Sequence, residues 1–250
     1  MTPEIPAYLL TFESTLRPLV AAIVLGLIWM GAMRMEAPAR SRYTTAGALS
    51  AALIAWLAVA QYIGSANIYF ANTETAVPTV LFGLMIPLIA AAIALRLSGS
   101  IASLVSAIPL PWIVAAQVYR VGGGIFLVLW ADGRMPWQFA LPAGIGDVTT
   151  GCLAVVVATS LARKAAGARR AAYLWCLFGI ADLVVAIAMG GMTAPGRAHL
   201  FALEAPNLLI SSYPLVMTPT FAVPLALMLH GLVLWRLRRE TASTSRLAVA

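Results

Sequence analysis

Seven long apolar runs are the feature of this sequence that most constrains its fold. Most of them reach the ~20 residues that a helix needs to cross a hydrocarbon core about 30 Å thick. Composition agrees, because 62% of the residues are hydrophobic and 10% are charged, whereas about a quarter are charged in soluble proteins. The sequence therefore predicts an all-α, polytopic membrane protein with seven transmembrane helices. We place them at residues 16–35, 46–64, 77–95, 111–131, 139–162, 171–189 and 208–235.

Basic residues in the loops predict how this bundle is oriented. Arg17, Arg134 and Arg197 lie at one end of the predicted helices. Twelve of the sixteen basic residues lie at the other end, namely Arg34, Arg40, Arg42, Arg96, Arg163, Lys164, Arg169, Arg170, Arg236, Arg238, Arg239 and Arg246. Loops rich in Lys and Arg stay in the cytoplasm, so we expect the N-terminus outside and the C-terminus in the cytoplasm. This topology accounts for the net charge of +7 without a nucleic-acid partner.

The whole chain is expected to form one membrane domain in the lipid bilayer of a bacterial inner membrane. Residues 1–239 hold all seven runs, and the loops between them leave no room for a soluble catalytic domain. Residues 240–250 are polar enough to form a disordered cytoplasmic tail. Any chemistry must therefore take place in or beside the bilayer.

Three ionisable residues, Arg120, Asp147 and Asp182, lie near the middle of three successive runs. A charge at bilayer depth costs roughly 2.5 to 3.5 kcal/mol on insertion scales, so it persists where it finds a partner or a wet cavity. At 1.5 Å per residue they lie about 16, 12 and 11 Å below the outer ends of their helices. We therefore expect them to share one layer. One arginine facing two aspartates leaves surplus negative charge, which an exchangeable proton on one aspartate would offset.

The residues around these charges are polar or small. In an α-helix Gln117, Arg120 and Gly124 share a face, so a polar stripe is followed by a notch for a neighbouring helix. Small residues also precede both aspartates, in Gly144-Ile145-Gly146-Asp147 and Gly179-Ile180-Ala181-Asp182. We assign Arg120, Asp147, Asp182, Gln117 and Tyr119 to a site for a small solute or a proton. The alternative interpretation is that Arg120 only bridges the aspartates and holds the helices together.

Histidine suggests a second kind of site. His230 is expected about five residues from the cytoplasmic end of the last run, and His199 lies in an outer loop. A haem would need His230 with a methionine, or a homodimer that supplies His230 twice. The alternative is a histidine that forms hydrogen bonds near the cytoplasmic interface. Cys152 and Cys176 lack the spacing of a metal site, so no metal is expected.

Gly144-Ile145-Gly146-Asp147 resembles the Gly-x-Gly-Asp motif of intramembrane aspartyl proteases such as presenilins and prepilin peptidases. The resemblance implies that Asp147 and Asp182 act as an acid/base pair that activates water. The order argues against it, because the motif's aspartate is the second of the pair in those proteases and the first here. We therefore assign no catalytic residue.

The segments 117–124, 140–151 and 221–230 resemble those of a group of bacterial inner-membrane proteins with no assigned function. Similarity to the PQ-loop and SWEET sugar transporters is one of topology, since the chain has no Pro-Gln dipeptide. Microbial rhodopsins are disfavoured because the single lysine, Lys164, lies in a loop.

These observations favour a small-solute or proton-coupled transporter with a buried Arg/Asp site. A membrane binding or sensory protein that holds haem or a lipid is the alternative, and an intramembrane enzyme with an aspartate pair is the third. The partners expected are the lipid bilayer and a small-molecule or ion ligand.

Overall fold

The computed structural model describes residues 3–70 and 79–247, and all regular structure in these ranges is helical. Seven helices are long and apolar enough to cross a membrane, which confirms the predicted all-α class and the number of spans. They are α1 (Ala7–Arg34), α2 (Ala39–Ser65), α3 (Val80–Leu97), the composite helix α5–η1–α6, α7 (Trp137–Ala162), α8 (Ala168–Thr193) and the span Thr218–Arg239 in the last helix.

Three features of the described residues depart from a simple bundle of α-helices. A short helix, α4 (Gly99–Ala107), follows α3, and the Ser98 side chain accepts a hydrogen bond from the Ile101 N–H at 3.3 Å to cap it. The fourth span consists of α5 (Leu110–Ala115), the 3₁₀ segment η1 (Ala116–Gly124) and α6 (Ile125–Ala131). The last one begins with a π-helical turn, η3 (Thr218–Ala222), and continues as α9 (Val223–Leu247).

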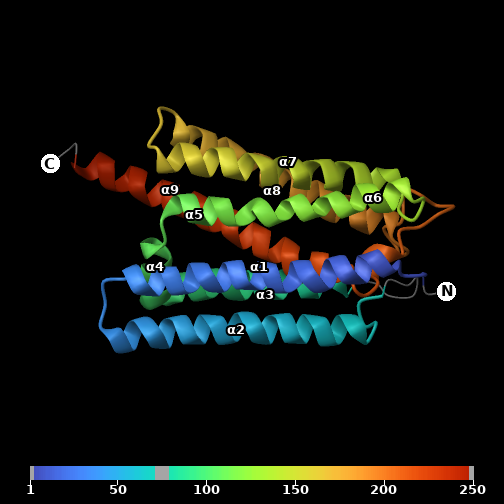
Figure 1. The fold of residues 1–250 in the computed structure, drawn as a ribbon, viewed down its shortest axis with the longest axis horizontal. Coiled ribbons are helices and arrows are strands. Elements are labelled where there is room, and N and C mark those ends of the chain that lie inside the picture. The colour runs from blue at the N-terminus through green and yellow to red at the C-terminus, as the bar shows by residue number, and fades with distance from the viewer. Residues whose placement is uncertain (1–2, 71–78, 248–250) are drawn as a thin grey trace.

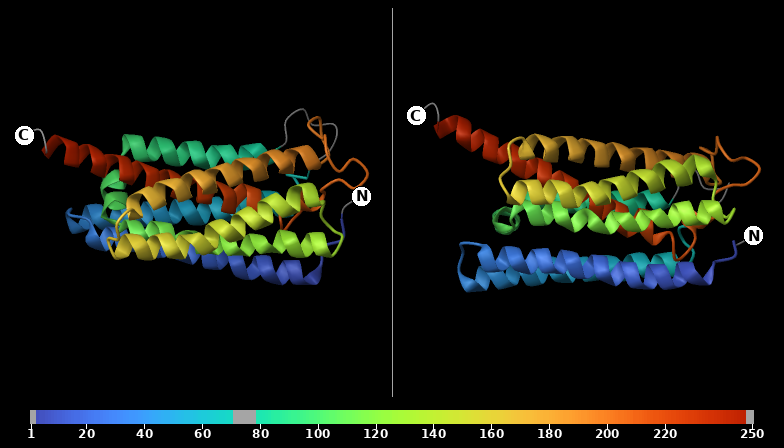
Figure 2. Two further views of the ribbon diagram at one scale, coloured as in Figure 1. Left: turned by 90° about the horizontal axis from the view of Figure 1, so that it is seen from above. Right: turned by 45° about the horizontal axis from the view of Figure 1, so that its top comes forward.

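Helix α9 runs obliquely through the middle of the bundle (Figure 1) and packs against α3, α5 and α8. The α1–α2 pair lies on one side of it, and α5–η1–α6, α7 and α8 lie on the other (Figure 2). The two termini lie at opposite ends of the bundle, as an odd number of spans requires. We call these the N-terminal end and the C-terminal end.

The first and last spans begin at residues other than those expected. Helix α1 begins at Ala7 rather than at residue 16, because Pro18 is tolerated inside it and residues 7–15 contain no glycine or proline. The last span begins at Thr218 rather than at residue 208. Pro214 lacks an N–H and interrupts helical hydrogen bonding there, so the preceding residues form only the short 3₁₀ turn η2 (Leu209–Ser211).

The last helix extends into the predicted tail. Helix α9 continues as far as Leu247, and residues 240–247 contain no glycine or proline that would end it. Residues 248–250 of the expected tail lie outside the described residues.

Candidate functional site

The winding of η1 decides which side chains of the fourth span line up. A 3₁₀ helix has three residues per turn, so residues three apart lie directly above one another. Gln117, Arg120 and Gly123 therefore share a face, in place of the Gln117, Arg120 and Gly124 expected for an α-helix. Continuous 3₁₀ winding over nine residues is uncommon and often marks a functional or strained segment.

Arg120 forms ion pairs with both aspartates, so the structure brings the three predicted charges together. Its Nε donates to Asp147 Oδ1 at 2.7 Å, and its Nη2 lies 2.7 Å from the same oxygen. Nη2 also pairs closely with Asp182 Oδ2. The side chains of Arg120, Asp147 and Asp182 are 2%, 16% and 7% exposed. One guanidinium on η1 thus joins α7 to α8 in the interior of the bundle.

His230 is the fourth member of this cluster, which the sequence did not predict. It is fully buried on α9, with its ring 4.6 Å from that of Trp175. Its Nε2 lies 3.2 Å from Arg120 Nη1, which also donates to the Gly179 carbonyl at 3.3 Å. The expected position near the cytoplasmic interface is therefore wrong. The error arose because helix depth was counted from an approximate end of the last run, while α9 crosses the bundle obliquely.

The contact with Arg120 also determines which nitrogen of the His230 ring carries the proton. A guanidinium has donors and no acceptor, so Nε2 must accept and Nδ1 must carry the ring proton. Nδ1 is buried and has no hydrogen-bond partner among the described residues. Because the Arg120 guanidinium contacts Nε2, the imidazole is poorly placed to bind a haem iron through that nitrogen.

Three glycines make room for the cluster. A β-carbon on Gly123 would overlap the Asp147 side chain, and one on Gly146 would overlap the Asp182 carboxylate. A β-carbon on Gly179 would overlap the His230 ring. Each glycine lies on a helix different from that of the residue it accommodates, so the glycines permit the close helix approaches that let the charges meet.

Gln117 and Tyr119, which we assigned to the same site, lie beside it and bind α9 and η3 of the last span. Gln117 Nε2 donates to the Ala226 carbonyl and the Tyr119 hydroxyl donates to the Ala222 carbonyl, each at 3.0 Å. The two acceptors are one helical turn apart. These bonds hold η1 against the last span and so position Arg120.

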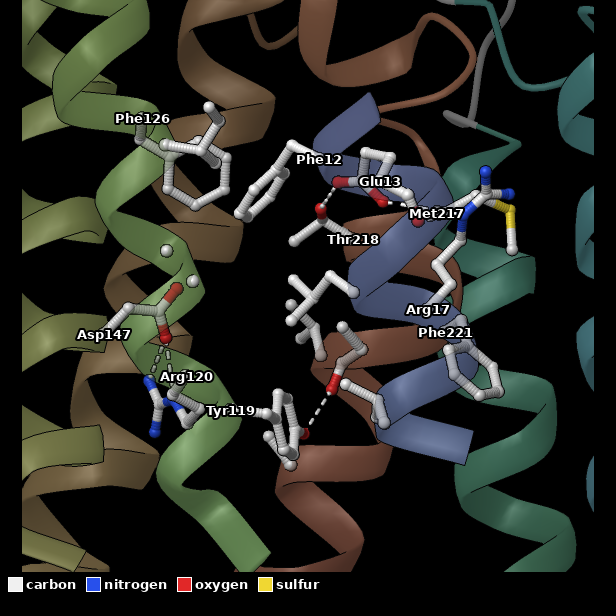
Figure 3. A pocket seen from close by; sticks show the side chains of 18 of the residues that line it. Phe12, Glu13, Arg17, Tyr119, Arg120, Phe126, Asp147, Met217, Thr218 and Phe221 are labelled. Atoms are coloured by element: carbon white, nitrogen blue, oxygen red, sulfur yellow. Dashed lines mark hydrogen bonds and ion pairs between the residues drawn. The ribbon is translucent and has the colours of Figure 1, made fainter. Parts of the chain in front are cut away.

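Asp147 also borders two cavities. A small cavity of about 40 Å³ is lined by Asp147, Arg120 and Tyr119 on one side and by Glu13 and Thr218 on the other. Figure 3 shows the second Asp147 oxygen directed away from Arg120 and into this space. A larger cavity of about 470 Å³ extends from Asp147 and Thr218 to the loop after α8 at the N-terminal end, and its lining is mainly apolar.

Glu13 is a buried residue of this region, although it lies before the first predicted span, residues 16–35. Its spacing of four residues from Arg17 was the available signal, since Glu and Arg at i and i+4 face the same side of a helix.

The described residues contain no group of three His, Cys, Asp or Glu side chains that could hold a metal ion.

The chain belongs to the family described as a domain of unknown function, DUF8737, whose model matches residues 77–238. The match confirms the expected resemblance to a family with no assigned function. Arg120, Asp147, Asp182 and His230 all lie within the matched residues, whereas α1 and α2 lie before them. No curated protein and no solved structure matches the chain.

Proposed function

We propose that this membrane protein carries a small solute or protons across the bilayer, and that Asp147 binds the transported proton or cation. One observation carries the proposal. Asp147 pairs with Arg120 through one oxygen and borders two cavities, so it connects the buried charge cluster to space that a solute can enter.

The charge balance of the cluster supports a positively charged occupant. Arg120 contributes one positive charge, and the two ionised aspartates contribute two negative charges. His230 accepts from Arg120 and is neutral. A net negative charge in the interior of a membrane bundle is costly, so a proton or a cation at Asp147 would stabilise it.

The larger cavity supplies an entry route in this proposal. Its volume of about 470 Å³ lies within the range of roughly 300 to 1,000 Å³ that is usual for small-molecule sites. It reaches the N-terminal end, which the distribution of basic residues predicts to be outside the cell. Access from the periplasmic side of a bacterial inner membrane follows from that orientation.

Irregular helices beside the cluster also favour transport. Arg120 lies in the 3₁₀ segment η1, and Thr218, which borders both cavities, begins the π-helical turn η3. Transporters often build their sites from helices that depart from α geometry near the bilayer midplane, because these can change their winding at a lower cost than a regular helix.

The test is proton flux into liposomes that contain the purified protein and a trapped pH-sensitive dye. An imposed pH gradient and membrane potential should acidify them faster than empty liposomes. Asp147→Asn should slow the flux at least about tenfold, as expected when a proton-carrying group is removed. Asp132→Asn is the matched control, because Asp132 accepts from the Tyr8 hydroxyl in an exposed position outside both cavities. Equal flux in Asp147→Asn and the unmodified protein would contradict the proposal.

A second candidate function is supported by the apolar lining of the larger cavity. A membrane protein that binds a lipid or another apolar molecule would use this space without moving protons. An apolar ligand that raises the thermal unfolding temperature, in a protein without proton flux, would favour this candidate. The third possibility, an aspartate pair acting on water, is disfavoured because both carboxylates pair with Arg120.

A further inference from the structure

Glu13 is a second buried carboxylate that faces the candidate site from α1. Its side chain is 4% exposed, and it lies about 9 Å along the helix from the start of α1. Glu13 therefore lies inside the bundle, on the side of the N-terminal end, and outside the residues that the family model matches.

The Glu13 carboxylate has few strong partners. The Thr218 hydroxyl donates to Oε1 at 3.4 Å, and Arg17 Nε lies 3.7 Å from Oε2. These distances exceed those of a good hydrogen bond. Three of the five N–H donors of Arg17 are directed to other acceptors, namely the Glu13 carbonyl at 2.9 Å, the Gln61 side chain and the Tyr213 hydroxyl at 3.3 Å. The carboxylate thus retains capacity to bind a proton or water.

The small cavity lies between Glu13 and Asp147. Glu13 and Thr218 lie on one side of it, and Asp147 and Arg120 lie on the other (Figure 3). Its volume of about 40 Å³ is enough for roughly three water molecules, and both ends offer the polar partners that an ordered water needs. The rest of its lining is mainly apolar, so water here would depend on the polar groups of Glu13, Thr218, Asp147 and Arg120.

We propose that Glu13 is a second proton-binding residue and that water in this cavity links it to Asp147; this rests on the proposed transport function. A proton that enters through the larger cavity and passes Thr218, which borders both cavities, binds the ionised Glu13 carboxylate. It then passes through the cavity water to Asp147, and Glu13 becomes ionised again. Arg17 attracts the ionised carboxylate from α1, and Asp147 repels it across the cavity. Thr218, Arg120 and Tyr119 are the other polar groups that line this cavity.

A purely structural role for Glu13 would make a different prediction. If Glu13 only holds Thr218 and Arg17 in place, a glutamine should replace it, because it has the same length and can accept the Thr218 hydrogen bond. A proton-binding role is lost with glutamine and restored with aspartate. Glu13→Gln and Glu13→Asp therefore separate the two roles.

The experiment compares Glu13→Gln, Glu13→Asp and Glu4→Gln in the liposome flux assay. Glu4 is a matched control, since its side chain is 87% exposed at the same end of the bundle. We expect Glu13→Gln to lower proton flux at least about tenfold and Glu13→Asp to recover part of it. Glu4→Gln should stay within about twofold of the unmodified protein. Flux in Glu13→Gln equal to that of the unmodified protein would overturn the inference and leave the proposed function standing.

Infrared difference spectra between acidic and alkaline buffer supply a measurement that does not depend on transport. A carboxyl band that exchanges with D₂O and disappears in Glu13→Gln would assign a water-accessible proton to Glu13. Absence of such a band would overturn the inference. If the unmodified protein moves no protons, proton transport fails as its function, and this spectrum alone then decides whether Glu13 binds a proton.

Discussion

The carboxylate of Asp182 occupies the space that a β-carbon on Gly146 would need. Helices α7 and α8 therefore approach each other closely at the level of the charge cluster, and the approach depends on the absence of a side chain at residue 146. Gly26 on α1 provides a contrast, because no described atom lies within 4 Å of a β-carbon placed there.

Gly146→Ala should destabilise the protein by about 1 to 3 kcal/mol, because overpacking a tight contact forces the surrounding backbone or side chains to move. Thermal unfolding in detergent measures the effect. Gly26→Ala is the control and should leave the unfolding temperature almost unchanged. Equal unfolding temperatures for the two variants would show that α7 and α8 can separate at this level at little cost.

Arg120 should be energetically coupled to both aspartates. Arg120→Ala removes the cation from two buried carboxylates, and breaking a buried pair in this way typically costs about 3 to 5 kcal/mol. Adding Asp147→Asn or Asp182→Asn should recover part of that loss, with a coupling energy of about 0.5 to 3 kcal/mol in a double-mutant cycle.

The exposed pair of Arg134 and Glu4, 3.8 Å apart, is the control for this cycle. Exposed ion pairs are usually worth less than about 1 kcal/mol, so its coupling should be much weaker. Additive effects for Arg120 with each aspartate would contradict a single charge cluster.

Membrane orientation can be tested with single cysteines at Ala205, in the loop after α8, and at Ala166, in the loop before it. Both residues are exposed and lie at opposite ends of the bundle. The background should carry Cys152→Ala and Cys176→Ala. Because basic residues gather at the end that contains Ala166, an impermeant thiol reagent added to intact cells should label the cysteine at 205 and not the one at 166. The reverse pattern would place the N-terminus in the cytoplasm.

His230 is expected not to bind haem, because its Nε2 faces the guanidinium of Arg120. Titration of the purified protein with haem should give the same Soret spectrum for the unmodified protein and for His230→Ala. A Soret shift that is seen in the unmodified protein and lost in His230→Ala would contradict this expectation and favour the sensory function.

Arg120, Asp147 and Asp182 could be assigned to one layer from the sequence because depth in a helix follows from counting residues. The membrane makes this simple rule effective, since apolar length fixes where each span lies. His230 escaped the same rule because α9 begins at Thr218 with a π-helical turn and crosses the bundle obliquely. Its depth depends on packing between helices, which residue counts along one helix do not contain.

The burial of Glu13 was not predicted for a related reason. An acidic residue just before an apolar run is usually read as lying outside the membrane, and Thr218, which lies beside the buried carboxylate, is 205 residues away. Gly123 was passed over in favour of Gly124 because an α-helical period was assumed for a segment that winds as a 3₁₀ helix. Both errors concern which face of a helix meets which neighbour, a property of tertiary structure.

The 3₁₀ winding of η1 makes the fourth span longer than an α-helix with the same number of residues. Each 3₁₀ residue advances about 2.0 Å, compared with 1.5 Å in an α-helix. Over the nine residues from Ala116 to Gly124 the difference is roughly 4.5 Å, accompanied by about half a turn of rotation. Rewinding this segment as an α-helix would shorten and rotate the fourth span at the same time. It would draw α5 and α6 together and rotate Arg120 and Gly123 by about 60° relative to each other, so that the arginine and the glycine beside Asp147 would no longer lie directly above one another.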